Sequence, residues 1–259
     1  MAHFAPQYEL FKIMDNLSKL GRYTFWGVLI LSIIPFIFND FCVKNNLINI
    51  VNISNIIGIS LFFGTELINE LVIIPRADNK RRDDFIDNSF GSKFSINSSN
   101  GYYDNDEINK GLYKAAVNLF ENCFFTYSLV KITIFHKSIV AIIMIVIIIV
   151  LAFYGFKEVS FILNILQAFF SVNILGLFLK NLALFKELTS IQDNWILLFQ
   201  QTDIKTNTLK YQANIYKYWL EYETLHSRIN ARISNKIFTK HNTILTENWK
   251  QLKQKYNIL

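Results

Sequence analysis

The chain of 259 residues lacks the motifs by which catalytic and metal-binding proteins are usually recognised. Its four histidines are scattered, and neither an HExxH motif nor a Cys/His ligand spacing occurs. Glycine-rich phosphate loops are also missing. The sequence therefore predicts no enzyme, no cofactor and no bound metal.

Charge is absent from the nineteen residues between Ser138 and Phe156, SIVAIIMIVIIIVLAFYGF. A helix needs about twenty apolar residues to cross roughly 30 Å of hydrocarbon. Isoleucine, valine, leucine and phenylalanine each favour insertion by roughly 0.3 to 0.6 kcal/mol near a helix centre. The run predicts a transmembrane helix, and 52% of apolar residues over the whole chain agrees with a membrane protein that keeps water-exposed parts.

Three further apolar segments predict that the chain crosses the membrane four times. They are Tyr23 to Cys42, Leu47 to Ile68 and Val159 to Phe178. Lys19 and Arg22 precede the first segment as in a signal peptide, but no small-residue cleavage site follows, so this segment is predicted to be retained. The fold class is therefore predicted as an all-α membrane protein with four transmembrane helices in two hairpins.

The distribution of lysine and arginine predicts the topology, because short cytoplasmic loops collect these residues. The two tight turns hold only Lys44 and Lys157. Both termini and the middle segment are therefore predicted in the cytoplasm, with Cys42 and Cys123 on opposite sides of the membrane, which argues against a disulfide between them. The predicted divisions are a cytoplasmic arm 1–22, a hairpin 23–74, a cytoplasmic loop and amphipathic helix 75–137, a second hairpin 138–186 and cytoplasmic helices 187–259.

Two predicted membrane helices carry stripes of polar side chains at helical spacing. The stripes consist of Asn49, Asn52 and Asn55, continued by Glu66 and Glu70, and of Ser160, Asn164, Gln167 and Ser171. A buried amide without a partner costs roughly 1 to 3 kcal/mol, so both stripes are predicted to face protein or water. Two interpretations stay open: the side chains hydrogen-bond between packed helices, or they line a water-filled pore once several copies assemble. Charges deep in the apolar segments, which mark coupled transporters, are missing.

The remaining segments predict a helical cytoplasmic part. Pro75 is predicted to end the second membrane helix, and residues 95–110 to form a loop. An amphipathic helix from Leu112 follows, which either lies along the membrane surface or runs directly into the third membrane helix. Its apolar face holds Leu112, Ala116, Leu119, Cys123, Tyr127, Val130 and Ile134, opposite Lys114, Glu121, Ser128 and Lys131.

The C-terminal region is predicted to be helical, because neither proline nor glycine interrupts residues 177–259. One long helix is expected from Leu209 to Ile233, and a second is expected to be capped by Asn242 or Thr243. Packing on the chain's own middle segment and self-association both cover their apolar stripe, and self-association is the favoured interpretation.

Basic residues stand beside aromatic residues in the middle segment. Arg76, Lys80, Arg81 and Arg82 can neutralise phosphates, and Tyr102 and Tyr103 can stack on a base. This predicts either ligand binding or a cluster that holds anionic lipid headgroups. Asp83, Asp84 and Asp87 could bind Mg²⁺, but the neighbouring cations favour a solvated network of ion pairs.

The hairpin layout, with RRDDFIDNSFG at 81–91 and GYYDNDEINKGLYKAAVNLFENCFF at 101–125, resembles the bacterial SMODS-associated four-transmembrane effectors. The resemblance implies a dormant, oligomeric inner-membrane protein that opens a pore and halts the infected cell before a phage matures. It also implies a cyclic nucleotide or a sensor protein as trigger at the cytoplasmic face, and no nucleic acid polymer as partner. The alternative is a non-conducting membrane scaffold that docks a cytoplasmic partner through its C-terminal helices.

Overall fold

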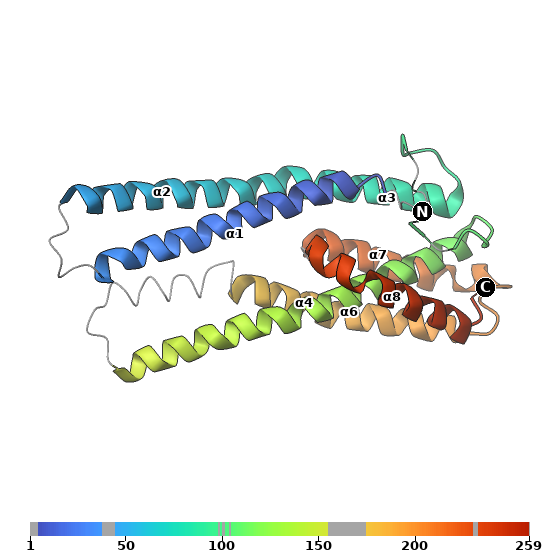
Figure 1. Cartoon of the computed structure of the whole chain (residues 1–259). Coiled ribbons are helices and arrows are strands. Elements are labelled where there is room, and N and C mark those ends of the chain that lie inside the picture. Colours follow the sequence, from blue (N-terminus) through green and yellow to red (C-terminus); the bar gives the residue numbers. More distant parts are fainter. Residues whose placement is uncertain are drawn as a thin grey trace. The chain divides into compact units, whose positions relative to one another are not determined.

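The computed structural model describes residues 5–37, 45–97, 99, 102–103, 105–154, 175–229 and 233–258 (Figure 1). Within these residues all regular structure is helical, which confirms the all-α prediction. The elements are α1 (Tyr8–Ile37), α2 (Asn45–Ile68), the π-helix η1 (Asn69–Ile73), α3 (Ile74–Phe90), α4 (Leu112–Tyr154), α6 (Leu177–Phe199), the 3₁₀ helix η3 (Thr208–Tyr211), α7 (Gln212–Arg228) and α8 (Asn235–Lys255).

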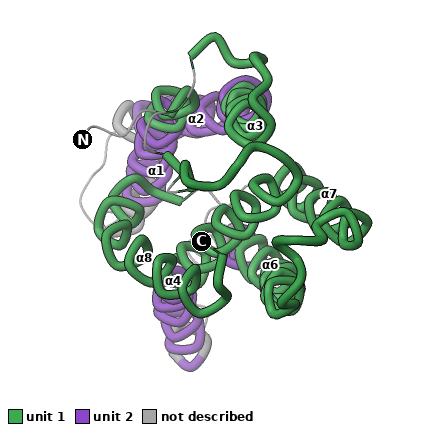
Figure 2. Tube along the Cα trace, turned by 90° about the vertical axis from the view of Figure 1, so that its right-hand side faces the viewer, with its two compact units in different colours: residues 1–12, 76–134, 180–259 green, residues 13–75, 135–179 purple. Residues whose placement is uncertain are grey.

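The chain divides into two compact units, each assembled from segments that are distant in the sequence (Figure 2). Unit 1 consists of residues 1–12, 76–134 and 180–259, and unit 2 of residues 13–75 and 135–179. Among the described residues, two helical runs are long and apolar enough to cross a membrane, namely Asn49–Phe90 and Leu112–Val150. The first predicted membrane helix, which overlaps Tyr8–Ile37, is not one of these two runs, and the fourth lies mostly outside the described residues. Four crossings therefore stay a prediction.

In unit 2, α1 and α2 form an antiparallel hairpin that closes over small side chains (Figure 1). Near one end, Asn69 donates from Nδ2 to Ser18 Oγ at 3.2 Å. Further along, a Cβ atom on Gly58 would stand 2.4 Å from Val28 Cγ2, so nothing larger than glycine fits there without movement. Close approach over small residues is how membrane helices gain packing energy without a hydrophobic driving force. The first predicted hairpin is therefore present as a helical pair.

The helical backbone continues past Pro75, where the sequence predicted an end. The π-helix η1 joins α2 to α3, and the amide of Ile74 donates to the carbonyl of Asn69, five residues earlier. Proline has no N–H to donate and its ring crowds the preceding turn. The wider π turn makes room for the ring, and Pro75 then occupies the first turn of α3, where its missing N–H is not required. The prediction that Pro75 ends the helix was wrong for this reason.

Unit 1 has an aromatic core to which α3, α4, α6, α7 and α8 all contribute. The ring of Phe120 on α4 lies 5.1 Å from Phe199 on α6 and 5.2 Å from Trp249 on α8, between ring centroids. Trp195 and Trp249 are fully buried. Each aromatic pair of this kind contributes about 0.5 to 1.5 kcal/mol beyond the burial of its area. This core holds α3 and α7 in place.

The helix predicted from Leu112 runs directly into the third predicted membrane helix, because α4 is continuous from Leu112 to Tyr154. Its predicted apolar face is buried at Ala116, Leu119, Cys123 and Val130. Lys114 and Glu121 on the opposite face are buried as well. The segment that follows α3 supplies their contacts: Asn105 donates to Glu121 at 2.6 Å, and Asp106 stands 3.8 Å from Lys114 Nζ. The first turns of α4 are therefore enclosed on both faces.

The C-terminal helices differ from their prediction in bounds and in packing. The expected long helix ends at Arg228, and α8 begins after Ser234, whose side chain accepts a hydrogen bond from the amide of Ile237 at 3.3 Å. Ser234 is thus the N-cap in place of Asn242 or Thr243, which lie inside α8. The apolar stripe is covered only in part within the chain: Trp249 belongs to the core that α4 shares and Trp219 packs against it, whereas Leu209, Tyr216 and Leu220 are exposed. Self-association stays a prediction.

Candidate functional site

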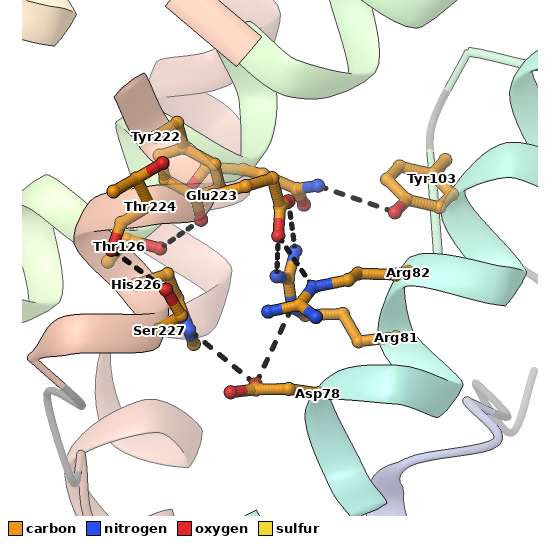
Figure 3. A network of polar contacts seen from close by, with 11 residues as sticks. Asp78, Arg81, Arg82, Tyr103, Thr126, Tyr222, Glu223, Thr224, His226 and Ser227 are labelled. Atoms are coloured by element: carbon orange, nitrogen blue, oxygen red, sulfur yellow. Dashed lines mark hydrogen bonds and ion pairs between the residues drawn. The ribbon is translucent and has the colours of Figure 1, made fainter. Parts of the chain in front are cut away.

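Unit 1 contains a network of charged side chains between α3 and α7, which we call the α3–α7 network (Figure 3). It consists of Asp78, Arg81 and Arg82 from α3 and of Glu223 and His226 from α7. Arg81 and Asp78 are buried, with relative exposures of 6% and 4%. Helical spacing explains the grouping, since residues three or four apart share one face of a helix.

Two guanidinium groups converge on one carboxylate in this network. Arg81 donates from Nη1 to Glu223 Oε1 at 3.0 Å and from Nη2 to Oε2 at 2.6 Å. Arg82 donates from Nε to the same Oε2 at 3.0 Å. Figure 3 shows both arginines reaching from α3 toward Glu223 on α7. Glu223 therefore accepts three charge-assisted hydrogen bonds, the stronger class of hydrogen bond in proteins.

Electrostatic attraction keeps the Arg81–Glu223 pair charged although both groups are buried. Burial by itself would lower the pKa of Arg81, but the charge of Glu223 raises it above its usual value. Burial by itself would raise the pKa of Glu223, but the charge and hydrogen bonds of Arg81 hold it below its usual value. A buried ion pair adds little net stability, because the loss of hydration offsets the attraction. Removal of one partner, in contrast, costs about 3 to 5 kcal/mol.

Asp78 is the second carboxylate of the network. Its Oδ1 atom stands 3.5 Å from His226 Nδ1 and 3.8 Å from Arg81 Nε. Burial would raise the pKa of Asp78, but the contact with His226 and the charge of Arg81 hold it below its usual value. Asp78 thus faces the Nε edge of Arg81, while Glu223 takes the Nη fork.

Aromatic hydroxyl groups extend the network to α4. The ring of Tyr222 lies under the Arg81 guanidinium, 6.0 Å from its Cζ atom, and its hydroxyl is 3.0 Å from Thr126 Oγ1. Asn122 on α4 donates to the hydroxyl of Tyr103 at 3.3 Å. Burial raises the pKa of Tyr103 well above its usual value, so this hydroxyl stays neutral. The polar contacts therefore join α3, α4 and α7 within unit 1.

The acidic residues after Arg82 organise the loop that follows α3. Asp87 accepts hydrogen bonds from Ser92 Oγ at 2.8 Å and from the amides of Phe94 and Ser95 at 2.8 and 2.7 Å. Asp84 accepts from the amide of Ser99 at 2.7 Å. Burial raises the pKa of Asp84, whereas the loop amides hold the pKa of Asp87 below its usual value. The described residues contain no group of three or more acidic, histidine or cysteine ligands suited to a metal ion.

The ion pairs of this segment are local only in part: Arg81 contacts Asp78 of the same helix, but both Arg81 and Arg82 also pair with α7. Arg81 and Arg82 pair with Glu223, 142 and 141 residues away, and not with Asp83 or Asp87. The predicted solvated network is therefore partly buried and joins two helices. Arg76 and Lys80 are exposed, Tyr102 is exposed and Tyr103 is buried. Ligand binding by these residues stays a prediction.

The amide stripe of α2 lies in unit 2. Asn49 and Asn52 are exposed, Asn55 is half-buried, Glu66 is half-buried and Glu70 is exposed. The seam with α1 is formed by other positions, since Val51 and Thr65 are buried and Gly58 contacts Val28. Asn164, Gln167 and Ser171 lie outside the described residues, as does Cys42. Cys123 is buried with a free thiol.

Sequence reasoning missed Asp78, Glu223 and His226. Asp78 stands in the same charged run as Arg81, but Glu223 lies on a helix whose periodicity pointed only to its apolar residues. The separation of 142 residues leaves no local signal for the pair. Comparison with protein families, curated proteins and solved structures finds no match of any kind.

Proposed function

We propose that this protein is an oligomeric, pore-forming effector that permeabilises the bacterial inner membrane in antiphage defence. In this proposal both termini and unit 1 lie in the cytoplasm, and a cyclic nucleotide or a partner protein triggers opening there. Several copies contribute α2 to the pore, and the lipid bilayer surrounds the apolar faces of α2 and α4.

The observation that carries the proposal is the exposure of Asn49 and Asn52 on a helix apolar enough to cross a membrane. Their neighbours Ile50, Ile53 and Ile56 are also exposed, between 58% and 64%. An exposed isoleucine suits hydrocarbon, but an amide there lacks partners at a cost of roughly 1 to 3 kcal/mol. Two such amides on one helix favour a state in which other copies or water satisfy them.

Water is the better partner because the amides stand outside the seam that α2 already forms. Val51, Gly58 and Thr65 take up the contact with α1 and leave the asparagines on the free surface. In a homo-oligomer the same free surface is repeated by each copy around the symmetry axis. A ring of exposed amides around the symmetry axis binds water, and a water-filled path along that axis conducts ions.

Leakage from vesicles tests this function. The full chain is reconstituted in liposomes loaded with a self-quenched dye, with candidate cyclic nucleotides supplied on both sides of the bilayer to open the pore. The double variant Asn49→Leu/Asn52→Leu is compared with Ile50→Leu/Ile57→Leu, which changes exposed apolar positions on the same helix. We expect the wild type and the isoleucine variant to release dye and the asparagine variant to retain it. Equal leakage from the wild type and both variants would show that the amides do not line the pore. No leakage from any of the three proteins would refute the pore itself.

A scaffold function has one observation in its favour. Unit 1 exposes an apolar stripe along η3 and α7, where Leu209 is 73%, Tyr216 46% and Leu220 67% exposed. An exposed stripe of this kind marks a docking surface for a partner. If the wild type causes no dye release from vesicles, and Leu220→Lys abolishes binding of a cytoplasmic partner, then the protein is a scaffold and not a pore.

A further inference from the structure

We propose that Arg81 and Arg82 form a binding site for a phosphoryl group, and that Glu223 fills this site with the chain's own carboxylate until such a ligand takes its place. As the place where a trigger acts, the site rests on the proposed function of the protein and makes the trigger a phosphate monoester, because the phosphates of a cyclic nucleotide are diesters without a terminal phosphoryl group. As an anion site it stands on the contacts of unit 1 alone.

The donor set fits a phosphoryl group better than it fits a carboxylate. Three N–H groups converge on Glu223, and Oε2 has to accept two of them, at 2.6 Å from Arg81 and 3.0 Å from Arg82. A terminal phosphoryl group offers three oxygens to the same three donors. It also carries more charge, which two guanidinium groups can neutralise.

Access to the site is through Glu223 and Arg82. The side chain of Arg82 is 37% exposed and that of Glu223 15%, whereas Arg81 lies deeper at 7%. A rotamer change of Glu223 therefore opens the Nη fork of Arg81 to solvent, and the apolar core stays in place. Among the described residues, Glu223 is the acceptor that both arginines share.

Asp78 keeps Arg81 in position when Glu223 leaves. Its Oδ1 atom faces the Nε edge of Arg81 at 3.8 Å, and the Tyr222 ring supports the guanidinium from the other side. The negative charge of Asp78 repels any anion that approaches the Nε edge of Arg81, so the site selects for an anion that contacts the Nη fork and stays away from Asp78. A single terminal phosphoryl group meets this condition.

Displacement of the Glu223 side chain from the two arginines by a ligand would loosen α7 from α3. Trp219, one turn before Glu223 on α7, packs 5.2 Å from Phe85 and 6.4 Å from Phe90 of α3, between ring centroids. A ligand that holds the arginines and frees Glu223 removes one polar link of α7 to α3 and leaves the His226–Asp78 contact and these aromatic contacts. The environment of Trp219 therefore reports occupancy of the site.

Anion rescue of stability tests the site. The full chain in phosphatidylcholine nanodiscs is unfolded by heat in chloride and in inorganic phosphate of equal ionic strength, and in nanodiscs that contain phosphatidic acid. Glu223→Gln is compared with Glu221→Gln, which removes an exposed carboxylate that pairs with Lys217 at 3.7 Å on the same helix. We expect phosphate or phosphatidic acid to restore the lowered unfolding temperature of Glu223→Gln, and neither to act on Glu221→Gln.

The two anions separate the sources of the phosphoryl group. Rescue by free phosphate identifies a soluble ligand, and rescue by phosphatidic acid alone identifies a lipid headgroup. Phosphate should also bind Glu223→Gln about tenfold more tightly than the wild type, because the competing carboxylate is gone. Equal rescue by chloride, or equal gains by Glu221→Gln, would overturn the site.

A second variant keeps the proposal testable if Glu223→Gln does not fold. In the wild type labelled with fluorotryptophan, the fluorine resonance of Trp219 should shift and saturate with phosphate, and Arg82→Gln should need about tenfold more phosphate because one of three donors is lost. A resonance that never shifts overturns the site. Saturation without dye leakage leaves the anion site standing and refutes its role as the place where the pore is triggered.

Discussion

The two helix pairs of this protein are held together by opposite means. In unit 2, α1 and α2 approach through small residues such as Gly58 and through one buried amide, Asn69. In unit 1, α3 and α7 are joined by Arg81, Arg82 and Glu223, with aromatic rings beside them. Close packing has a single good arrangement, whereas an ion pair can exchange its partner. We therefore expect the α1–α2 contact to stay closed, and we expect the α3–α7 network to open when a ligand takes the place of Glu223, as proposed above.

Removal of the shared carboxylate should have the largest effect on this contrast. Glu223→Ala leaves Arg81 buried with Asp78 as its remaining partner, and we expect a loss of about 3 kcal/mol in the free energy of unfolding. The matched change Glu221→Ala should cost about 0.5 kcal/mol or less, because its ion pair is exposed. Denaturant unfolding of the full chain in detergent measures both. Equal losses in the free energy of unfolding would mean that the buried network stabilises the protein no more than an exposed ion pair does.

Acid should weaken unit 1 through the same carboxylates. The folded pKa values of Glu223 and Asp78 are held below their usual values, so the unfolded chain binds more protons as the pH falls. Their stabilisation is present above the unfolded pKa values, near pH 4, and is lost as the pH falls through the folded ones. Asp84, whose pKa burial raises, acts with the opposite sign. The pH dependence of thermal unfolding should flatten in Glu223→Gln, and an unchanged acid limb would contradict this.

A methyl group at the seam should disturb unit 2 in a way that no ion could rescue. Gly58→Ala places a Cβ atom 2.4 Å from Val28 Cγ2, and overpacking of this kind costs about 1 to 3 kcal/mol. Gly64 has open space around its Cβ position, so Gly64→Ala should stabilise the helix by about 0.5 to 1 kcal/mol. Thermal unfolding in detergent separates the two. A neutral Gly58→Ala would mean that the seam yields easily.

The edge of the network should contribute least. Arg82 is 37% exposed, and a pair at such a site contributes about 0 to 1 kcal/mol. We expect Arg82→Gln to cost about 0.5 kcal/mol in unfolding measurements. If Arg82→Gln lowered the free energy of unfolding as much as Glu223→Ala, the exposed Arg82 contact would be as important for stability as the buried Arg81 contact.

Local patterns in the sequence predicted most of the helices and little of the network. The apolar run in Leu47 to Ile68 predicts α2 because insertion and helix formation depend on nearby residues. The prediction that Pro75 ends the helix was wrong because it assumed an α-helical turn before the proline. The π turn of η1 gives the proline ring room within a continuing helix. Ser234 was missed as a cap because Asn242 and Thr243 are equally good capping residues, and only the core decides where α8 begins.

The Arg81–Glu223 pair could not be predicted, because its two halves come together only when α7 packs against α3. The charges at 76–87 pointed to the surface, where charged residues are usually found. The apolar stripe of the C-terminal helices pointed to other copies, since the sequence does not tell which surface covers it. The aromatic core with Phe120 and Trp249 covers part of the stripe inside the chain and leaves Leu209, Tyr216 and Leu220 exposed.

Water access to the α2 stripe tests the proposed pore most directly. Asn52→Cys and Ile57→Cys are made in a chain with Cys42 replaced by serine, while Cys123 is kept because it is buried and burial raises the pKa of its thiol. A membrane-impermeant thiol reagent is then added to phage-infected cells that express each variant, because infection is the proposed condition for opening. A hydrated pore predicts rapid labelling at Asn52→Cys and none at Ile57→Cys. No labelling at Asn52→Cys, or equal labelling at both positions, would contradict the proposed pore.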